Sequence, residues 1–381
     1  MSWPIKPLGE LVENCNAKRV PLKQSERDGR TGKYRYYGAS GIIDFVDDFL
    51  FDGDYLLIGE DGNNLLSRTT PIAFHASGQF WVNNHAHVLK CNGKVDLGFL
   101  AYYINSINLE PYITGSAQPK LNKKNLDSIK IPLPPLEKQK RIAAILDKAD
   151  AIRQKRKQAI ELADEFLRSV FLDMFGDPVS NPKGWEVKLI SEIAEVQGGL
   201  QVSKKRESLP VTCSYLRVAN VFRGKLDLSE IKTMQVTQKE MERISLITDD
   251  LLVVEGHGNK NEIGRCANWD GSISPIIHQN HLIRVRVIND LVSPHYLADF
   301  INSPGGRVQL ARASNTTSGL NTISTKMVKD TIVLIPDMKV QNKYIEIRQE
   351  IYALIDNLLI GKEDDMHLFN ALSQKAFSGQ L

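Results

Sequence analysis

Several features that mark secreted proteins, membrane proteins and metalloproteins are absent from this 381-residue sequence. Its four cysteines lie far apart without a Cys-x-x-Cys pair, so neither a disulfide framework nor a zinc ribbon is expected. No apolar run approaches the roughly eighteen residues that span a bilayer, and no signal peptide opens the chain. We therefore expect a soluble, cytoplasmic protein with reduced thiols.

Signatures of catalysis are missing as well. The sequence has no G-x-x-x-x-G-K-[ST] phosphate-binding loop and no N-P-P-[YF] or D-P-P-Y tetrapeptide, so it lacks the usual marks of nucleotide hydrolysis and of amino-methyl transfer. His85 and His87 share one face of an expected strand, but the matching stretch later in the chain has only His281, which argues against a metal site. Glu60 and Asp61 lack the spaced Glu-x-Lys partner of many nucleases. The sequence therefore predicts no catalytic residue, metal or cofactor in this chain.

Glycine and proline are absent from one long stretch, residues 136–175. Prolines at 132, 134 and 135 keep the entry to this stretch non-helical, and Gly176 to Pro178 supply a helix stop. The pattern predicts one long helix of about 60 Å.

The apolar residues of this helix recur in a seven-residue repeat. Alternating steps of three and four give a narrow seam with one basic member, and charged residues fill the positions between. A stripe this thin on a helix this long favours packing against a second helix over packing on the helix's own domain. The predicted seam consists of Ile142, Ile145, Ala149, Ile152, Arg156, Ala159, Ala163, Phe166 and Val170.

A partner for this helix is predicted near the C-terminus. Adding 202 to each seam position gives a second seam in the same register, and the proline-containing entry at 133–139 has a counterpart at 335–341. The second seam is interrupted near Gly361 and Asp365, which leaves the continuity of this helix open. Its members are Tyr344, Ile347, Ile351, Leu354, Leu358, Gly361, Asp365, Leu368 and Leu372.

Matching segments also precede each helix, so the chain contains one unit twice. The offset between copies grows from 182 to 202, which places the insertions in loops. The matched segments are 3–11 with 185–193 (a strand and a short helix), 53–58 with 249–254 (a buried strand), 84–85 with 280–281, 99–106 with 296–303 (a helix) and 121–122 with 320–321. We predict globular domains at 1–131 and 179–334, and helices within 132–178 and 335–381.

Two copies of one helix that meet through the same seam form a self-complementary contact, which requires a two-fold axis. The helices should then run antiparallel and hold the two domains at opposite ends in opposite orientation. This arrangement suits two inverted half-sites on duplex DNA, which lie about 34 Å or a multiple of it apart in dimeric DNA-binding proteins. The predicted fold is α+β: two tandem α/β domains, each followed by a long helix, with the helices paired as an antiparallel coiled coil of pseudo-two-fold symmetry.

Polar loops of both domains carry side chains suited to DNA, although a solvated surface role remains open for each residue alone. Lys and Arg neutralise phosphates, while Arg, Asn and Gln can pair with base edges. The net charge of +3 permits such a partner without proving one. Candidates in the first copy are Lys18, Arg19, Arg35, Tyr36, Tyr37, Asn63, Asn64, Arg68, Gln118, Lys120 and Asn122. Those in the second copy are Lys204, Lys205, Arg206, Arg217, Asn220, His257, Asn259, Lys260, Asn315 and Thr316.

Specific motifs give the chain a resemblance to a known family. They are LPPLEKQKRIAAILDKAD at 133–150, MFGDP at 174–178 and the ending LSQKAFSG at 372–379, with YYGASG at 36–41 and GSAQPKL at 115–121 in support. These motifs closely resemble the specificity (S) subunit of type I restriction-modification enzymes, and the likeness covers the whole chain in domain order.

The resemblance implies two target recognition domains, each binding half of a bipartite DNA site, with the helices fixing the gap. It also implies two modification (methyltransferase) subunits that dock on the helices and methylate adenine N6 with S-adenosylmethionine, and restriction subunits that use ATP and magnesium. The chain itself would bind and aim without an active site. Two alternatives stay open: a DNA-cleaving or methylating enzyme that acts alone, and a structural coiled-coil connector without DNA contact.

Overall fold

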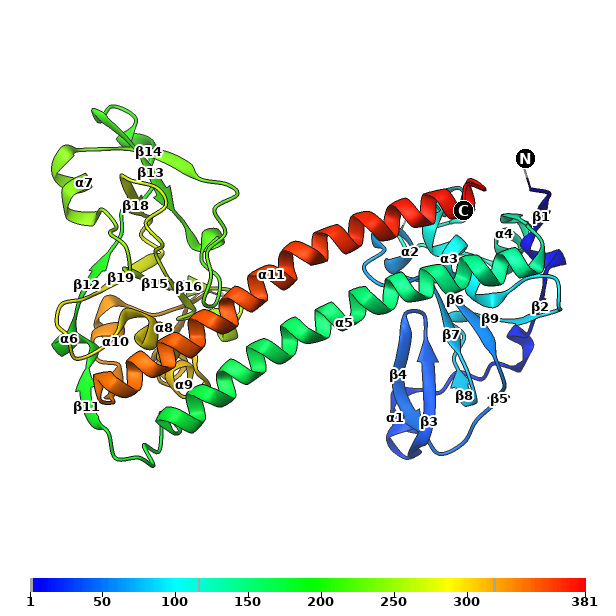
Figure 1. Cartoon of the computed structure of the whole chain (residues 1–381), viewed down its shortest axis with the longest axis horizontal. Helices are drawn as coiled ribbons and strands as arrows, with labels where there is room; N and C mark the ends of the chain where they lie inside the picture. Colours follow the sequence, from blue (N-terminus) through cyan, green and yellow to red (C-terminus); the bar gives the residue numbers. More distant parts are fainter. Residues whose placement is uncertain (1–2, 116, 318–319) are drawn as a thin grey trace. The chain divides into compact units, whose positions relative to one another are not determined.

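The computed structural model describes residues 3–115, 117–317 and 320–381 and has a mixed α and β architecture (Figure 1). The chain divides into two compact units. Unit 1 comprises residues 1–158 and 358–381, and unit 2 comprises residues 159–357. Two helices of 40 residues each, α5 (Leu136–Phe175) and α11 (Met338–Phe377), are divided between the units. The units therefore differ from the predicted four-part division, because each half-helix shares a core with a globular segment.

The globular segment of unit 1 is built on two four-stranded sheets, in the orders β2-β9-β6-β7 and β4-β3-β8-β5, and one two-stranded sheet, β1-β10. Its strands are β1 (Ile5–Pro7), β2 (Val12–Asn14), β3 (Thr31–Gly38), β4 (Gly41–Val46), β5 (Phe51–Asp52), β6 (Tyr55–Gly59), β7 (Ala73–Ala76), β8 (Gln79–Val82), β9 (Ala86–Cys91) and β10 (Lys130–Pro132). Its helices are η1 (Leu8–Glu10), η2 (Asn16–Lys18), α1 (Gln24–Asp28), α2 (Asn64–Ser67), α3 (Leu97–Ser106), η3 (Glu110–Tyr112) and α4 (Lys123–Ser128).

The globular segment of unit 2 has the sheets β12-β19-β15-β17, β14-β13-β18, β16-β21-β20 and β11-β22. Its strands are β11 (Glu186–Leu189), β12 (Ala194–Gly198), β13 (Val211–Leu216), β14 (Lys232–Val236), β15 (Leu251–Val254), β16 (Gly256–His257), β17 (Cys266–Asn268), β18 (Ile276–His278), β19 (Leu282–Val287), β20 (Asn315–Thr317), β21 (Leu320–Thr322) and β22 (Ile332–Ile335). Its helices are α6 (Ile190–Ile193), η4 (Lys204–Arg206), η5 (Val218–Asn220), α7 (Gln238–Ile244), η6 (Lys260–Glu262), α8 (Pro294–Asn302), α9 (Pro304–Ala313) and α10 (Thr325–Lys329).

The central sheet has the same strand order and register in both units. Leu56 faces Leu89 across β6 and β9, just as Leu251 faces Val285 across β15 and β19. The middle strands β6 and β15 are buried along their whole length, as expected for short continuous apolar runs. The tandem duplication predicted from the sequence is confirmed at the level of strand pairing.

Buried amide side chains brace the two copies in the same way. Gln139 of α5 accepts a hydrogen bond from the Asp96 backbone N–H (2.9 Å) and donates to the Pro134 carbonyl (2.8 Å). Gln341 of α11 likewise accepts from the Ser293 N–H (2.8 Å) and donates to a proline carbonyl (2.7 Å). Because a buried amide without partners is costly, each glutamine fixes how its helix enters the unit.

A further asparagine pair follows the same scheme. The Asn105 side chain bonds to the backbone N–H and C=O of Ala73, at 3.0 and 2.7 Å. Asn302 makes the same two bonds to Cys266, at 3.1 and 2.9 Å. Each amide ties the C-terminal end of a short helix, α3 or α8, to a strand of the central sheet.

Two details of the predicted alignment are wrong. The sequence comparison matches 53–58 with 249–254, whereas the register of the central sheet relates Leu56 to Leu251, one residue earlier. The sequence comparison matches Leu121 with Leu320, whereas the backbone N–H of Leu121 donates to Glu60 and that of Ile323 donates to Glu255, at 2.8 Å in each case. The structural counterpart of Leu121 is therefore Ile323, 202 residues further on. The three-residue difference arises because both dipeptides read Leu-Asn, which is a weak match beside the repeated hydrogen bond.

The long helices run antiparallel within each unit. In unit 1, Arg153 of α5 lies over the Phe369 ring (4.6 Å), and Arg156, further along α5, pairs with Asp365, an earlier residue of α11 (2.6 Å). In unit 2, Phe171 of α5 contacts Tyr344 of α11, with 5.7 Å between ring centroids. The predicted antiparallel pairing is thus confirmed inside each unit.

The predicted seam is right at most positions. The apolar seam members that are buried or partly buried are Ile142, Ile145, Ala149, Ala159, Ala163, Val170, Tyr344, Ile347, Ile351, Leu358 and Leu372. The prediction is wrong for four members that are at least half exposed: Ile152, Phe166, Leu354 and Leu368. Further buried residues, which the prediction missed, lie one position after a seam position and include Leu146, Leu167, Phe171, Arg348 and Ile355.

The cause of this one-residue rotation is the globular segment. In unit 1 the helix face that carries Leu146 shares one core with Phe99 and Ile104 of α3, and in unit 2 the face that carries Leu167 shares a core with Tyr296 of α8. Each long helix therefore packs on its domain and on its partner helix together, which turns its buried face away from the seam of a simple two-helix pair.

The second long helix is continuous through Gly361, a point that the sequence leaves open. The Arg156 guanidinium lies against the Gly361 backbone, and a Cβ at this position would clash with Nη1, Cζ and Nη2 of that arginine. Arg156 also donates from Nε to Asp365 (2.6 Å). The interruption in the apolar seam is thus a polar contact between the helices, with glycine providing the space.

The corrected helix face can be tested with two aspartate substitutions. Leu146→Asp buries an uncompensated carboxylate in the unit 1 core and should reduce the free energy of unfolding by about 3–5 kcal/mol. Ile152→Asp, at a half-exposed position, should cost less than about 1 kcal/mol. Urea unfolding followed by circular dichroism measures both, and an equal or larger loss in Ile152→Asp would contradict the observed helix orientation.

Candidate nucleic-acid interface

Eleven of the 21 candidate DNA-binding residues lie on loops that meet at one end of the central sheet in each unit. Loop cluster 1 comprises residues 16–19, 60–63, 83–85, 114–115 and 117–120 of unit 1. Backbone and side-chain hydrogen bonds join these loops: Arg19 donates to the Asn84 carbonyl (3.3 Å), and the Gly62 N–H donates to the Pro119 carbonyl (3.1 Å). Loop cluster 2 comprises the corresponding residues 199–206, 255–262, 279–281 and 320–323 of unit 2, and the Asn280 N–H donates to the Leu200 carbonyl (2.9 Å).

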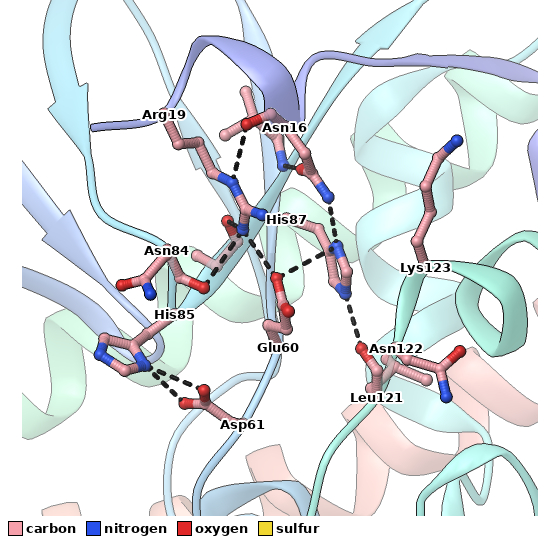
Figure 2. Close-up of polar contacts among 12 residues, drawn as sticks. Asn16, Arg19, Glu60, Asp61, Asn84, His85, His87, Leu121, Asn122 and Lys123 are labelled. Carbon is pink, nitrogen blue, oxygen red and sulfur yellow. Dashed lines mark hydrogen bonds and ion pairs between the residues drawn. The ribbon is translucent and has the colours of Figure 1, made fainter. Parts of the chain in front are cut away.

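An arginine–glutamate pair lies at the centre of loop cluster 1 (Figure 2). Arg19 Nη1 is 2.7 Å from Glu60 Oε2, and the two side chains are each 13% exposed. The same nitrogen donates to the Ala86 carbonyl (2.7 Å), while Nε donates to the Asn16 carbonyl (3.1 Å). Arg19 therefore braces the loops, because most of its donors already have partners.

A buried histidine extends this network (Figure 2). His87 Nε2 lies 2.7 Å from the Leu121 carbonyl, which can only accept, so Nε2 carries the proton. Its Nδ1 then accepts a hydrogen bond from the Asn16 amide (2.8 Å). Burial lowers the pKa of His87, which favours this neutral form. His87 thus links β9 to the segment before α4 without acting as a charged group.

Glu60 is the charged group of the network. Burial alone would raise its pKa, but the hydrogen bond from Arg19 and the positive charges nearby hold the pKa below its ordinary value. Lys120 Nζ lies 3.3 Å from the second carboxylate oxygen, and the lysine side chain is half exposed. At the rim, His85 Nδ1 is 2.9 Å from Asp61 (Figure 2). The hydrogen-bonded network around Glu60, in which the buried charges are paired, therefore lies beneath the exposed polar and basic side chains.

Loop cluster 2 repeats the backbone of this junction but not its charges. The Glu255 N–H donates to His281 (2.9 Å), and the Ile323 N–H donates to Glu255 (2.8 Å). The position equivalent to Arg19, 182 residues later, holds Gln201. Burial raises the pKa of Glu255, which His281 Nδ1, 3.6 Å away, only partly offsets. The two copies thus share a frame and differ in the side chains that the frame carries.

Three predicted contact residues are buried, and for them the prediction is wrong. Tyr36 of β3 is wholly buried, and the adjacent Tyr37 packs edge-on against Phe80 (5.5 Å between centroids). Asn220 is 3% exposed. The Asn220 amide donates to the Asp227 and Glu230 carbonyls, at 2.8 and 3.0 Å. Tyr36 and Tyr37 point to opposite faces of β3 and belong to two different core clusters, so both faces of the strand are covered at this end.

Hydrogen bonds within the domain hold a second group of predicted residues. This group comprises Arg19, Asn64, Arg68, Asn122, Arg206, Arg217, His257 and Asn259. Arg206 donates twice to Glu240, at 3.1 Å each, and together with the capping contacts of Thr237 it lowers the pKa of Glu240 to about 2. Such residues set the shape of the loops.

The remaining predicted residues are exposed and free to meet a ligand. They are Lys18, Arg35, Asn63, Gln118, Lys120, Lys204, Lys205 and Lys260. Asn315 and Thr316 belong to β20, but their side chains lie outside the described part of the chain. Sequence analysis missed Asn16 as a bracing residue and treated His87 only as a metal candidate. The apolar residues on both sides of His87 were the signal that it faces a core.

Within residues 3–115, 117–317 and 320–381, no group of three or more His, Cys, Asp or Glu side chains is arranged to hold a metal ion. Over the same residues, no helix combines the length and hydrophobicity of a transmembrane span.

Glu60 has a buried arginine partner and its counterpart Glu255 has none in the described part of the chain, so replacing each glutamate with glutamine should change the free energy of unfolding differently. Glu60→Gln leaves the Arg19 guanidinium buried without a carboxylate and should reduce the free energy of unfolding by about 1–3 kcal/mol at pH 7. Glu255→Gln removes a poorly compensated buried charge and should change stability by less than about 0.5 kcal/mol or increase it. Urea unfolding of the full chain measures both, and an equal loss in the two variants would contradict the assignment.

The pH dependence of Glu60→Gln follows from the sign of the Glu60 shift. Because the folded-state pKa of Glu60 is lowered, its stabilising effect is present above its ordinary value of 4.5 and is lost as the pH falls through the folded-state value. The difference in free energy of unfolding between wild type and Glu60→Gln should therefore become smaller as the pH falls below 4.5.

Comparisons with known proteins agree with this architecture. Residues 2–162 match the family model described as the type I restriction modification DNA specificity domain. The chain is 29% identical over 320 residues to the EcoKI specificity subunit of Escherichia coli, an alignment that covers 77% of this chain and 68% of that protein. It is 39% identical over 147 residues to a Haemophilus influenzae protein named as a type I restriction enzyme specificity subunit, covering 39% of this chain and 37% of that one.

A solved structure resembles the whole chain. The crystal structure of a type I restriction-modification system S subunit from M. genitalium matches with a TM-score of 0.62 at 14% identity, covering 99% of this chain and 96% of that one. At this identity the likeness shows a shared fold. The matched family model, the named relatives and this shared fold agree with the motifs of the sequence: residues 2–162 carry a type I restriction modification DNA specificity domain, and the chain is similar over most of its length to type I restriction enzyme specificity subunits.

Proposed function

We propose that this chain is the DNA sequence-recognition subunit of a type I restriction-modification complex, in which each domain binds one half of a bipartite target. The observation that carries the proposal is one hydrogen-bonded frame that occurs twice and presents different loop side chains each time. A conserved frame with divergent loops is what two half-sites of different sequence require. Reading two half-sites also requires only binding, so the proposal needs no catalytic group in this chain.

The exposed residues of the loop clusters divide into two roles. Lys18 and Lys120 in cluster 1, and the adjacent lysines at 204 and 205 in cluster 2, are suited to phosphates, which give affinity without sequence preference. Asn63 and Gln118 carry the amide groups that pair with adenine edges in the major groove. Because Gly62 bonds to Pro119, these two amides lie on neighbouring loops.

In this proposal the long helices set the distance between the half-sites. Both helices are continuous over 40 residues and pair antiparallel inside each unit, which supports a stiff spacer between inverted recognition domains. The chemistry belongs to partners: two modification subunits that use S-adenosylmethionine to methylate adenine N6 after flipping the base, and restriction subunits that use ATP and magnesium. The complex would act on DNA in the cytoplasm.

The outward apolar residues of the helices offer a docking site for the modification subunits. In unit 2, Leu162 and Phe166 are 63% and 58% exposed on α5. Large apolar side chains this exposed favour a protein partner over solvent. The half-exposed Ile152 and Leu368 extend the same character to unit 1. In this proposal Ile152, Phe166 and Leu368 are exposed because they contact a partner subunit and not the other long helix.

Exchange of one domain tests the recognition proposal. Residues 1–131 would be replaced by the equivalent domain of a relative with a different target, and the methylated adenines of a host carrying the modification subunits would be mapped by sequencing. One half of the methylated motif should change while the other half and the spacing stay the same. Unchanged methylation, or methylation by this chain without partners, would contradict the proposal.

Docking of the modification subunits is tested separately with Phe166→Glu. This substitution should weaken binding of the modification subunit by about tenfold or more, because a buried anchor is replaced by a charge. The matched control is Ile288→Glu, an apolar residue of unit 2 that is 62% exposed on the loop after β19. Affinities are measured by surface plasmon resonance. An equal effect of both variants would place the docking site elsewhere.

A further inference from the structure

A cavity of about 480 Å³ lies within unit 2, and one residue of its wall, Arg223, donates to the Asn261 carbonyl of loop cluster 2. It is formed by the second half of α5, the corner between α8 and α9, the loop at Arg223 and two tyrosines of α11. Its apolar wall includes Leu167 and Phe171, while Arg223 and Arg307 face it from the other elements. Its volume falls within the range of small-molecule sites, which combine apolar walls with a few polar groups.

The two arginines lack carboxylate partners. Arg223 donates only to neutral oxygens, the Asn261 carbonyl (3.0 Å) and the Asn302 amide (3.4 Å). Arg307 Nε is buried and has no hydrogen-bond partner in the described structure. A buried guanidinium N–H without an acceptor is unfavourable, so the cavity presents unused donors to a ligand.

Two neighbouring carboxylates are already engaged. Glu262 accepts a hydrogen bond from Arg265 (2.9 Å), and Asp299 accepts from Arg348 (2.7 Å) and Tyr344 (2.8 Å). A third carboxylate, Asp164 of α5, also lines the cavity. Burial lowers the pKa of Arg223, and the charge of Arg307 lowers it further. The like charges of the two arginines therefore repel each other without full compensation.

A partly buried arginine of unit 1 has a carboxylate nearby. Arg68 donates to the Asn105 carbonyl (2.9 Å), and the Glu110 carboxylate raises the pKa of Arg68 against the effect of burial. In the unit 2 cavity, by contrast, the charge of Arg307 lowers the pKa of Arg223.

We propose that this cavity binds a small molecule that carries an oxyanion, a phosphate or a carboxylate, on an aromatic or apolar body. The oxyanion lies between Arg223 and Arg307, whose planar donor groups match its geometry. The body lies against Leu167 and Phe171. This site is separate from DNA recognition, so it stands whether or not the proposed function does.

Phenyl phosphate is the probe, since it joins an oxyanion to an aromatic ring, and inorganic phosphate and phenol represent its two halves. Binding to the full chain is measured by isothermal titration calorimetry at concentrations up to about 10 mM. Phenyl phosphate should bind more tightly than either half. Absence of binding, or phenol binding as tightly as phenyl phosphate, would overturn the proposal.

Arg307→Glu replaces a cation of the cavity wall with an anion and should weaken phenyl phosphate binding by about tenfold or more. The matched control is Arg312→Glu, which makes the same charge change at an exposed position of α9 outside the cavity and should leave binding within about twofold. The folding of each variant is checked by circular dichroism, and Arg307→Gln replaces Arg307→Glu if that variant does not fold.

Equal binding by wild type and the Arg307 variant would overturn the proposal. A competition with a DNA duplex of unrelated sequence distinguishes the source of the oxyanion. Retention of phenyl phosphate in excess duplex supports a small-molecule site, whereas displacement would assign the two arginines to the DNA backbone and overturn it.

Discussion

Each unit depends on the burial of one short helix against halves of both long helices. In unit 1 the Phe99 ring of α3 lies 5.5 Å from that of Phe377 on α11, and in unit 2 the Tyr296 ring of α8 lies 4.6 Å from that of Phe175 on α5. Neither a domain nor a half-helix could bury its apolar face alone. The buried Gln139 and its counterpart then fix the angle at which the helix leaves the domain. This shared core leaves the loops at the sheet end free to vary.

The positions of the long helices could be predicted well from the sequence, whereas the face that each helix buries could be predicted only in part. The absence of glycine and proline located α5 to within a residue, and the repeat located α11, because backbone chemistry decides where helices start and stop. The seam failed at Ile152 and Phe166 because the heptad pattern counts apolar residues without knowing how many partners a helix has. The cation Arg156 lies at a partly buried position, whereas the aromatic side chain of Phe166 is exposed. Only the location of the globular core decides between those faces.

The candidate interface was predictable as a set of loops but not residue by residue. Charged and amide side chains marked the right loops, yet Arg19 and Arg206 proved to hold those loops together. A long-range partner such as Glu60, 41 residues away from Arg19, leaves no periodic trace in the sequence. Tyr36 shows the complementary error, because both faces of β3 are covered where the strand ends, and Tyr36 and Tyr37 are therefore both buried.

The space beside Gly361 has a consequence for how the helices can slide. A pair held only by apolar side chains could shift by one heptad and still bury similar area. Here such a shift would bring Leu354 or Leu368 to the place of Gly361, so the Arg156 guanidinium would have to move aside and would lose its hydrogen bond to Asp365. Gly361 and Arg156 thus favour one alignment of the two helices over its neighbours. Because glycine has no side chain, it leaves the space in which the arginine of the other helix lies.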